Sequence, residues 1–368
     1  MERKSNLEDM GVNNYLNIYK GKKVLVTGHT GFKGSWLTIW LYKLGAEVVG
    51  ISLDPKTPKD NFVLSKIGTK IKDYRVDIRN LTDVEKIIEK EKPEILFHLA
   101  AQPIVLDSYS NPVYTYETNI MGTVNLLEAL RKSTSIKTGI FITTDKCYEN
   151  IEKDYSYKEI DPMGGFDPYS SSKGAAELVI SSYRRSFFQD SEKKIASARA
   201  GNVIGGGDWS PYRLMVDIIK SIQNNVNIEI RNPIATRPWQ HVLEPLGAYL
   251  LLGAKMNEER KYDEAWNFGP EKENIVTVRE LLDKTIAEYE QGKWKDVSDN
   301  EKLHEAKLLS LDITKAKTTL NWQPVLDLDE TIKYTVEWYK LYKCENVMDL
   351  CIKQIEKYTN KWKLKKEN

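Results

Sequence analysis

Short apolar runs alternate with longer amphipathic stretches over the first half of the chain. Continuous apolar runs are typical of buried strands, and apolar residues three and four positions apart are typical of helices. The predicted strands are Val24–Val26, Glu47–Ser52, Asp73–Asp77, Ile95–Leu99, Ile140–Thr144 and Ile195–Arg199. The predicted helices are Phe32–Leu44 with Gly45 as its cap, Thr82–Lys90 with Thr82 as its N-cap, Val113–Leu130 and Tyr169–Phe188. This alternation predicts an α/β fold with a doubly wound parallel sheet.

Beyond Asn202 the alternation loosens, and segments rich in Pro, Gly, Trp and Arg separate the predicted helices. These helices are Leu214–Ile222, Leu243–Met256, Val278–Tyr289 and Leu328–Tyr342. Open α/β sheets bind ligands at the carboxyl edge of their strands, so we expect a smaller lobe over that edge. The predicted domains are a nucleotide-binding core at 20–202, a substrate-binding lobe at 203–345 that is partly interleaved with the sheet, and a C-terminal helix or tail at 346–368.

Composition narrows the classes of function. The 368 residues carry a net charge of +1, so neither nucleic acid nor membrane is expected as a partner. Three cysteines give no disulfide framework, and no Cys or His spacing suggests a metal site. The N-terminal stretch is polar, and the most apolar stretch, Trp36–Ile51, contains Lys43 and Glu47 and is too short to span a bilayer. We therefore expect a cytoplasmic protein.

A glycine-rich turn joins the first predicted strand to the first predicted helix. Residues 27–34 read Thr-Gly-His-Thr-Gly-Phe-Lys-Gly. Gly28 permits the tight turn, Gly31 lets a pyrophosphate approach the backbone, and Gly34 lets the helix pack close to the sheet. The helix N-terminus offers unpaired N–H groups and a positive dipole to the phosphates. Because the turn lies between a strand and a helix, we favour a dinucleotide-binding Rossmann core over a glycine-rich turn without a ligand.

Tyr169 and Lys173 lie one helical turn apart on one face of a predicted helix. A free Tyr has a pKa of about 10 and is a poor base near neutrality. A nearby ammonium and the positive ring of oxidised NAD both favour the phenolate. Tyr169 could then remove a proton from a substrate hydroxyl while hydride leaves the same carbon. The pair is common in helices, but here it follows a dinucleotide loop and a strand that ends near Thr144, which makes it specific.

The Thr-Gly-x-x-Gly-Phe-x-Gly loop and the Tyr-x-x-x-Lys pair resemble the extended short-chain dehydrogenase/reductase superfamily. The resemblance implies NAD as the cofactor. An acidic residue often ends the second strand and holds the adenosine ribose, but Ser52 has that place here and Asp54 follows two residues later. Asp54 either reaches the ribose or is an ordinary turn residue, and the sequence leaves both open. The residues assigned to the cofactor are Gly28, Thr30, Gly31, Phe32, Lys33, Gly34, Ser52, Asp77, Ile78, Leu99, Ala100, Ala101, Thr143, Tyr169 and Lys173.

Thr144, Asp145 and Lys146 occupy positions that separate reaction types within this superfamily. The resemblance assigns Thr144 to a hydrogen bond with the reacting oxygen. Sugar-nucleotide 4,6-dehydratases need an acid–base pair at the next two positions because they expel a hydroxyl from C6. The pair is Asp-Glu in many of them and Asp-Lys here. Lys146 acts as the base only if it is neutral; alternatively it holds a water or the 4-keto oxygen. A surface ion pair is the non-functional alternative.

Further segments resemble the CDP-glucose 4,6-dehydratases over roughly residues 20–345. They lie at 27–34, 100–103, 118–123, 144–148, 163–174, 199–209 and 237–245, and His29, Lys146 and the Arg-Pro-Trp-Gln-His run at 237–241 are the specific features. The resemblance implies that Tyr169 deprotonates the 4-hydroxyl while hydride passes from C4 to NAD. The C5 proton is then removed as Asp145 protonates the departing C6 hydroxyl, and hydride returns to C6. The product would be a nucleotide-linked 4-keto-6-deoxy sugar, with NAD still bound.

Polar residues in the second half of the chain are candidates for holding the nucleotide-sugar substrate. Asn202 resembles an Asn that contacts the substrate diphosphate, although an Asn in a glycine-rich turn is equally natural. Arg213 and Arg237 are candidates for the phosphates, because a guanidinium binds them by paired hydrogen bonds. His241 completes the predicted substrate set, and a packed core histidine is the alternative for that residue.

The long predicted helices at 113–130 and 169–188 have apolar faces. Equivalent helices of the superfamily pair across a two-fold axis, so we expect a homodimer, or a tetramer built from it. Burial against the chain's own sheet would explain part of the same pattern. Three other functions stay open: a dehydratase of a GDP-, ADP- or UDP-linked hexose or heptose, a 4-epimerase of such a sugar, and a non-catalytic NAD-binding regulator.

Overall fold

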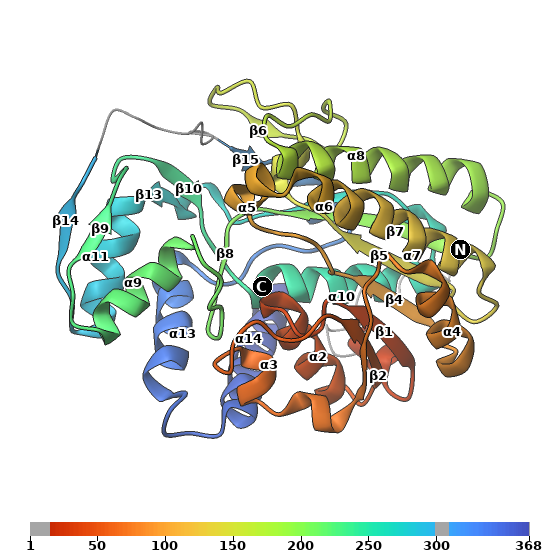
Figure 1. Cartoon of the computed structure of the whole chain (residues 1–368), viewed down its shortest axis with the longest axis horizontal. Helices are drawn as coiled ribbons and strands as arrows, with labels where there is room; N and C mark the ends of the chain where they lie inside the picture. The colour runs from red at the N-terminus through yellow and green to blue at the C-terminus, as the bar shows by residue number, and fades with distance from the viewer. Residues whose placement is uncertain (1–14, 299–308, 368) are drawn as a thin grey trace.

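Seven parallel strands form the central sheet of the computed structural model, which describes residues 15–298 and 309–367. The strand order is β12-β7-β5-β4-β1-β2-β3 (Figure 1). The strands are β1 Lys23–Thr27, β2 Glu47–Ser52, β3 Lys72–Arg75, β4 Ile95–His98, β5 Thr138–Ile142, β7 Lys194–Ala200 and β12 Ala265–Phe268. The chain moves outward from β1 to β3 and then returns to the other side of β1 through β4. This reversal confirms the predicted doubly wound sheet.

Helices cover both faces of the sheet. On one face lie α2 Phe32–Lys43, α10 Leu243–Glu258 and α14 Val347–Glu367; on the other lie α4 Leu81–Glu91, α7 Gly122–Lys132 and α8 Pro168–Tyr183. The strands supply both cores by alternation: Val24 and Val26 belong to the first core and Leu25 to the second. Because the strands are buried on both faces, both faces carry apolar residues, and this explains the continuous apolar runs in the sequence.

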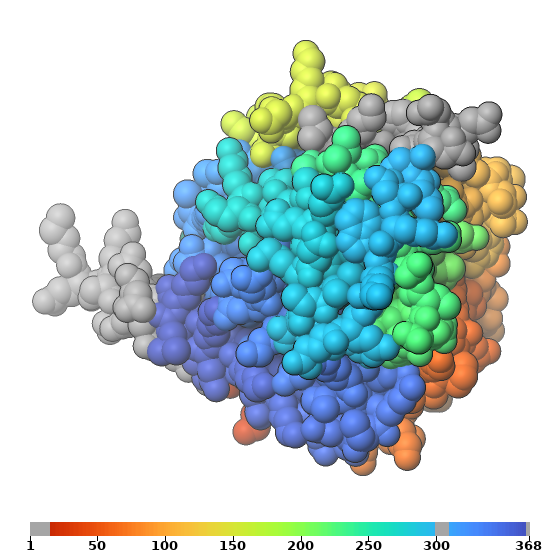
Figure 2. All heavy atoms as spheres, turned by 90° about the vertical axis from the view of Figure 1, so that its left-hand side faces the viewer, coloured from red at the N-terminus to blue at the C-terminus, as the bar shows by residue number. Residues whose placement is uncertain are grey.

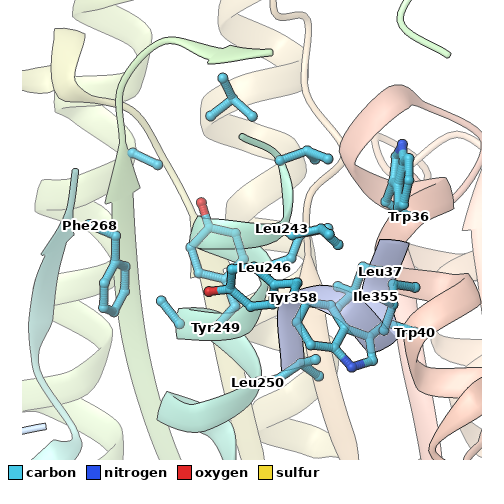
Figure 3. Close-up of a cluster of buried hydrophobic side chains, with 14 of the residues drawn as sticks. Trp36, Leu37, Trp40, Leu243, Leu246, Tyr249, Leu250, Phe268, Ile355 and Tyr358 are labelled. Atoms are coloured by element: carbon cyan, nitrogen blue, oxygen red, sulfur yellow. The ribbon is translucent and has the colours of Figure 1, made fainter. Parts of the chain in front are cut away.

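Three helices that are distant in sequence meet in the larger core (Figure 3). Trp36 and Trp40 come from α2, Tyr249 from α10 and Tyr358 from α14. The rings of Trp40 and Tyr358 meet edge to face, with centroids 5.6 Å apart. Trp362, one turn further along α14, is also fully buried. The C-terminal segment predicted as a helix or tail is therefore a helix that completes this core.

The second lobe has a small core of its own, at the left of Figure 1. It contains α9 Leu214–Gln223, β9 Ile228–Ile230, α11 Val278–Tyr289, β14 Trp294–Asp296 and α13 Leu328–Leu341, with the pair β10 Thr236–Pro238 and β13 Ile275–Thr277. Figure 2 faces this lobe, and its cyan and blue segments cover most of the visible surface. The lobe is not continuous in sequence, because α10 and β12 leave it and pack with the central sheet.

Some predicted boundaries were wrong. Asn80, not Thr82, caps α4, because the Asn80 side chain accepts a hydrogen bond from Asp83 N at 3.3 Å. The helix predicted over 113–130 is α6 Pro112–Tyr116, a π turn at Glu117–Met121 and α7. Elements without a strong period in sequence were not predicted: α3 Asn61–Leu64, α5 Val105–Ser110, α12 Thr314–Thr318, β6 Ser156–Tyr157, β8 Val203–Ile204, β11 Gln240–His241 and β15 Ser310–Leu311.

Glu244 is a buried carboxyl group at the start of α10. It accepts hydrogen bonds from the N–H groups of Val325 and Leu326, at 2.8 and 2.7 Å, and from the Tyr358 hydroxyl at 2.9 Å. Burial raises its pKa from 4.5 to about 7, against the effect of these three donors. The group therefore links α10, the segment before α13, and α14.

The folded protein should become less stable as the pH rises from 4.5 to about 7, because Glu244 holds its proton more tightly when folded than when unfolded. The raised pKa corresponds to about 3 kcal/mol. In Glu244→Gln the amide oxygen still accepts from both backbone N–H groups and the amide nitrogen can donate to Tyr358. We expect the variant to lose this pH dependence in urea unfolding measured across the window. An equal decline in both proteins would show that other groups cause it.

Candidate active site

Three glycines shape the turn from β1 to α2. Gly28 has a φ of +74°, and a Cβ there would lie 2.7 Å from Ala100 N. A Cβ on Gly34 would lie 2.0 Å from the Gly28 carbonyl oxygen, so the helix can start this close to the loop only with glycine. Gly31 is the N-cap and offers no side-chain hydrogen bond to the first turn. The turn therefore leaves backbone donors for an anion such as a pyrophosphate.

Two of the residues considered for the adenosine ribose face different surroundings. The Ser52 hydroxyl is buried and lies 2.7 Å from Thr30 Oγ1, which also donates to the Leu53 carbonyl at 3.0 Å. The Asp54 side chain is 86% exposed and lies 3.1 Å from Arg75 Nε. Ser52 and Thr30 thus form a fixed hydroxyl pair at the end of β2, and Asp54 stands at the surface beside it.

Asp77 and Ile78 follow β3. The Asp77 carboxylate binds the Arg79 guanidinium at 2.8 Å and the Arg79 N–H at 2.9 Å. The Ile78 side chain is buried, and a Cβ on Gly122 would lie 2.5 Å from its Cδ1. This side chain therefore serves as packing between the strand end and α7, a role the sequence did not predict for it.

Leu99, Ala100 and Ala101 follow β4 and run beside the glycine loop. The Ala100 N–H donates to Thr27 Oγ1 at 3.2 Å, and its backbone leaves no room for a side chain at Gly28. The segment and the glycine turn are therefore positioned as one unit, in keeping with a shared role toward the cofactor.

A buried chain of hydrogen bonds fixes His98 behind this segment. Thr123 Oγ1 donates to the Asn119 carbonyl at 2.7 Å, so it accepts from His98 Nε2 at 3.2 Å. His98 Nδ1 then accepts from Thr27 Oγ1 at 2.7 Å. Burial lowers the pKa of His98 to about 3, so the imidazole is neutral. His98 therefore has a structural role behind the segment at Leu99–Ala101, and the sequence analysis did not predict this role.

Tyr169 and Lys173 lie one turn apart on α8, and both side chains are buried. Asp167 caps the helix by accepting from Ser170 N at 2.9 Å. Burial raises the pKa of Tyr169 to about 12, while the Arg213 charge and hydrogen bonding with Thr144 act in the opposite direction. Burial lowers the pKa of Lys173 to about 8, opposed by the Glu177 carboxylate. Because both side chains are buried, a charged ligand that binds beside them would change their pKa values strongly.

Thr144, Asp145 and Lys146 form a tight turn directly after β5. Thr144 Oγ1 donates to Asp145 Oδ1 at 2.8 Å. Burial raises the pKa of Asp145, while the Thr144 hydrogen bond and the charges of Lys146 and Lys33 lower it. Lys146 is half-buried beside it. An acid whose burial favours the protonated form therefore lies next to the Tyr169 phenol.

Close glycine contacts bring this turn against α8. A Cβ on Gly174 would lie 2.4 Å from the Gly164 carbonyl oxygen and 3.1 Å from that of Cys147. Gly164 N in turn donates to the Cys147 carbonyl at 2.9 Å. Beneath the acid, a Cβ on Gly201 would lie 2.8 Å from Asp145 Oδ2. The separation of the acid from Tyr169 is therefore set by backbone contacts that tolerate no side chain.

A buried ion pair behind Lys173 was missed in the sequence. Glu177 and Arg199 are 3% and 4% exposed and lie 2.7 Å apart. Glu177 also accepts from Ser197 Oγ at 2.7 Å and from Thr143 Oγ1. The Thr143 hydroxyl, predicted to contact the cofactor, is therefore directed into this network. The spacing of Glu177 four residues after Lys173 was the available signal, and the pair ties α8 to β5 and β7.

The predicted substrate residues fall into two groups. Arg213 lies within electrostatic reach of Tyr169 and Lys33, and its buried Nε has no partner among the described residues. Arg237 is half-buried on β10, and Asn202 accepts from Gln240 N at 3.2 Å. These three residues retain side-chain groups suited to a diphosphate.

His241 lies in the core. It is fully buried, and its ring meets Trp36 and Tyr334 edge to face at 6.2 and 5.5 Å. Burial lowers its pKa to about 3, so it is neutral. The structure thus agrees with the packed alternative for His241.

Lys33 lies nearer the reacting residues than its assignment to the cofactor suggests. Burial and the Arg213 charge lower its pKa to about 8, and Asp145 acts in the opposite direction. Lys33, Arg213, Tyr169, Lys173 and Asp145 therefore share one electrostatic environment. One site thus joins the glycine loop, the end of β5 and the start of α8 and α9.

Within residues 15–298 and 309–367, no cluster of three His, Cys, Asp or Glu side chains is arranged to hold a metal ion. No described helix has the length and apolar character needed to cross a membrane. Residues 1–14, part of the polar N-terminal stretch, lie outside the described structure, and the cytoplasmic location stays a prediction.

Residues 25–335 match the family model described as GDP-mannose 4,6 dehydratase. The chain is 46% identical to the CDP-glucose 4,6-dehydratase of Salmonella typhimurium, over 92% of this chain and 96% of that protein.

Solved structures share the fold. The UDP-glucose 4-epimerase of Thermotoga maritima, solved with UDP-glucose, has a TM-score of 0.72 at 26% identity and covers 86% of this chain and 98% of its own. The dTDP-glucose 4,6-dehydratase of Bacillus anthracis, in complex with NAD, has a TM-score of 0.73 at 23% identity and covers 89% of this chain and 100% of its own. With most of its length matched by the family model and by a relative of high identity, the chain belongs to the GDP-mannose 4,6 dehydratase family.

Proposed function

We propose that the chain catalyses the NAD-dependent dehydration of CDP-glucose to CDP-4-keto-6-deoxyglucose. The observation that carries this proposal is the buried Asp145 acid, joined through the Thr144 hydroxyl to the Tyr169 phenol. A 4-epimerase needs the phenol but has no leaving hydroxyl to protonate. The choice of CDP-glucose rests on the Salmonella relative of that name, which is 46% identical.

The residues of the glycine turn fit NAD. The close approach of Gly28 to Ala100, the uncapped first turn of α2 and the Ser52–Thr30 hydroxyl pair form a cradle for the pyrophosphate and adenosine. Lys173 would hold the nicotinamide ribose. Bound NAD would supply a positive ring that lowers the pKa of Tyr169 and accepts and returns a hydride.

Each protein group then has one task. Tyr169, as phenolate, removes the proton of the 4-hydroxyl, and the Lys173 ammonium stabilises that phenolate. The resulting 4-ketone makes the C5 proton acidic. Asp145, whose pKa is raised by burial, donates its proton to the C6 hydroxyl as it leaves. Lys146, on the same turn, is placed to handle the C5 proton or to hold the 4-keto oxygen.

Arg213 and Arg237 are the proposed partners of the substrate diphosphate, with Asn202 beside them. The buried and unpartnered Nε of Arg213 favours this role, because a buried charge without an acceptor is costly. A diphosphate would supply that acceptor. Binding of the nucleotide would thereby place negative charge beside Arg213, next to the reacting residues.

We also propose that the chain forms a homodimer through α5–α8. Large apolar side chains are exposed on these helices and on the π turns that continue them: Leu106, Tyr109, Val113, Tyr116, Met121, Leu178 and Phe187. The corresponding helices of the superfamily pair across a two-fold axis, and a second copy would cover this apolar surface.

The substrate can be tested directly. Purified protein is incubated with CDP-, UDP-, GDP- or dTDP-glucose, and products are followed by mass spectrometry. We expect loss of one water from CDP-glucose without net consumption of NAD. Tyr169→Phe should abolish this loss while NAD binding, measured by fluorescence titration, survives. An isomer of unchanged mass would indicate an epimerase, and water loss only from another nucleotide would reassign the base.

Replacing Asp145 by Asn should separate the two halves of the reaction. The amide cannot donate a full proton to the departing hydroxyl, so dehydrated product should fall by about 100-fold. Oxidation at C4 should persist, seen as the near-ultraviolet band of reduced NAD after CDP-glucose is added. Asp161→Asn, a change on the neighbouring loop, serves as the control. Normal product formation by Asp145→Asn would refute its role as the acid.

The proposed dimer surface can be tested by introducing charged side chains into it. Val113 and Leu178 are 69% and 61% exposed, so Glu at both positions should leave the fold intact. We expect the double variant to run as a monomer in light scattering coupled to gel filtration. Leu364→Glu on α14, at a residue 62% exposed, is the matched control and should keep the native mass. A dimer that withstands the double change would place the interface elsewhere.

A further inference from the structure

The Thr144 hydroxyl lies between the base and the acid of the proposed reaction. Its Oγ1 donates to Asp145 Oδ1 at 2.8 Å, and it lies near enough to the Tyr169 oxygen to lower the pKa of that phenol through hydrogen bonding. The three residues are between 5% and 9% exposed. Thr144 therefore interacts with both of the others. Because it has one proton, it donates to one partner while it can accept from the other.

The proposed function leaves a proton imbalance after each turnover. Tyr169 gains the proton of the 4-hydroxyl and keeps it, because the product is a 4-ketone. Asp145 gives its proton to the C6 hydroxyl, which leaves as water. The hydride taken from C4 is returned to C6, and the proton taken from C5 is replaced. The enzyme therefore ends with one proton too many on Tyr169 and one too few on Asp145.

We propose, on the basis of that function, that the Thr144 hydroxyl returns this proton from Tyr169 to Asp145 and so resets the site for the next turnover. The O–H bond of Tyr169 breaks as its proton passes to Thr144 Oγ1. The O–H bond of Thr144 breaks at the same time, and its proton joins Asp145 Oδ1. Charge moves from the carboxylate to the phenolate, and no external acid or base is consumed.

The surroundings favour this internal path. Burial isolates both end groups from bulk water, which slows exchange by other routes. Asp145 Oδ1 faces Thr144, while Oδ2 lies over the Cα of Gly201, where a Cβ would come within 2.8 Å. The absence of a side chain at Gly201 leaves room for Oδ2 beside the backbone, on the side of the carboxyl group away from Thr144. A half-turn of the carboxyl group exchanges its two oxygens and presents the recovered proton to the next substrate.

The proposal is tested by Thr144→Val, which removes the hydroxyl at nearly constant volume, and Thr144→Ser, which keeps it. Rapid mixing with excess CDP-glucose, acid quench and mass spectrometry follow the water loss. We expect the later turnovers of Thr144→Val to be about 100-fold slower than its own first turnover, whatever the rate of that first turnover. Added imidazole, a small proton carrier, should accelerate the slow phase. Thr144→Ser should show the single phase of the unmodified protein.

A different pattern of rates would contradict the proposed proton return. If Thr144→Val slows the first and later turnovers by the same factor and imidazole has no effect, the hydroxyl serves only the chemical steps. Failure of the unmodified chain to dehydrate any nucleotide sugar would instead overturn the proposed function. Thr144→Ala carries the same test if the Val variant does not fold.

A spectroscopic measurement tests the idea without following turnover. Infrared difference spectra are recorded after one equivalent of CDP-glucose has reacted. In Thr144→Val the band of a protonated carboxyl group should be lost, because Asp145 stays ionised; in the unmodified protein and in Thr144→Ser it should be retained. The Asp145→Asn variant identifies the band. Retention of the band in Thr144→Val would overturn the proposal.

Discussion

The approach of α8 to the turn after β5 is the constraint on which the rest of the site depends. Gly174, Gly164 and the Cys147 carbonyl meet at distances that leave no space for a Cβ. This contact brings the side chains of Tyr169 and Lys173 over those of Thr144 and Asp145. The two segments belong to different elements of the sheet topology, and close backbone packing sets the distance between them. Catalysis is sensitive to small displacements of the reacting groups, so the geometry of this site depends on having glycine at these positions.

The parallel sheet explains why these parts converge. The carboxyl ends of β1, β4, β5 and β7 lie along one edge, and each continues into a segment of the site. Behind that edge, the Glu177–Arg199 pair ties α8 to β5 and β7, and His98 ties β1 and β4 to the π turn. These buried networks restrict the strands and helix relative to one another. They act as supports, while the reacting groups lie on the turns in front of them.

Local patterns in the sequence predicted most of the sheet and the principal residues of the site. The glycine turn, the Tyr169–Lys173 spacing and the apolar strands were readable because each depends on neighbours within a few positions. What could not be read depends on contacts across long sequence distances. The packing of Ile78 on Gly122 and the hydrogen bond from Thr143 to Glu177 are examples. The sequence analysis expected the second lobe to be partly interleaved with the sheet but did not identify β12 as the returning strand, because a four-residue strand with three apolar residues gives too short a pattern.

Electrostatics gives the site a dependence on its ligands. Burial raises the pKa of Tyr169 and Asp145 and lowers that of Lys33 and Lys173, so without ligands the site favours neutral groups. Added positive charge would favour the phenolate there, and an anion would supply an acceptor for the buried Nε of Arg213. A positive cofactor ring and a diphosphate have these two complementary charges. The same burial that suppresses the phenolate in the free protein would thus couple its formation to the presence of both ligands, and would protect the site from unproductive proton exchange when either one is missing.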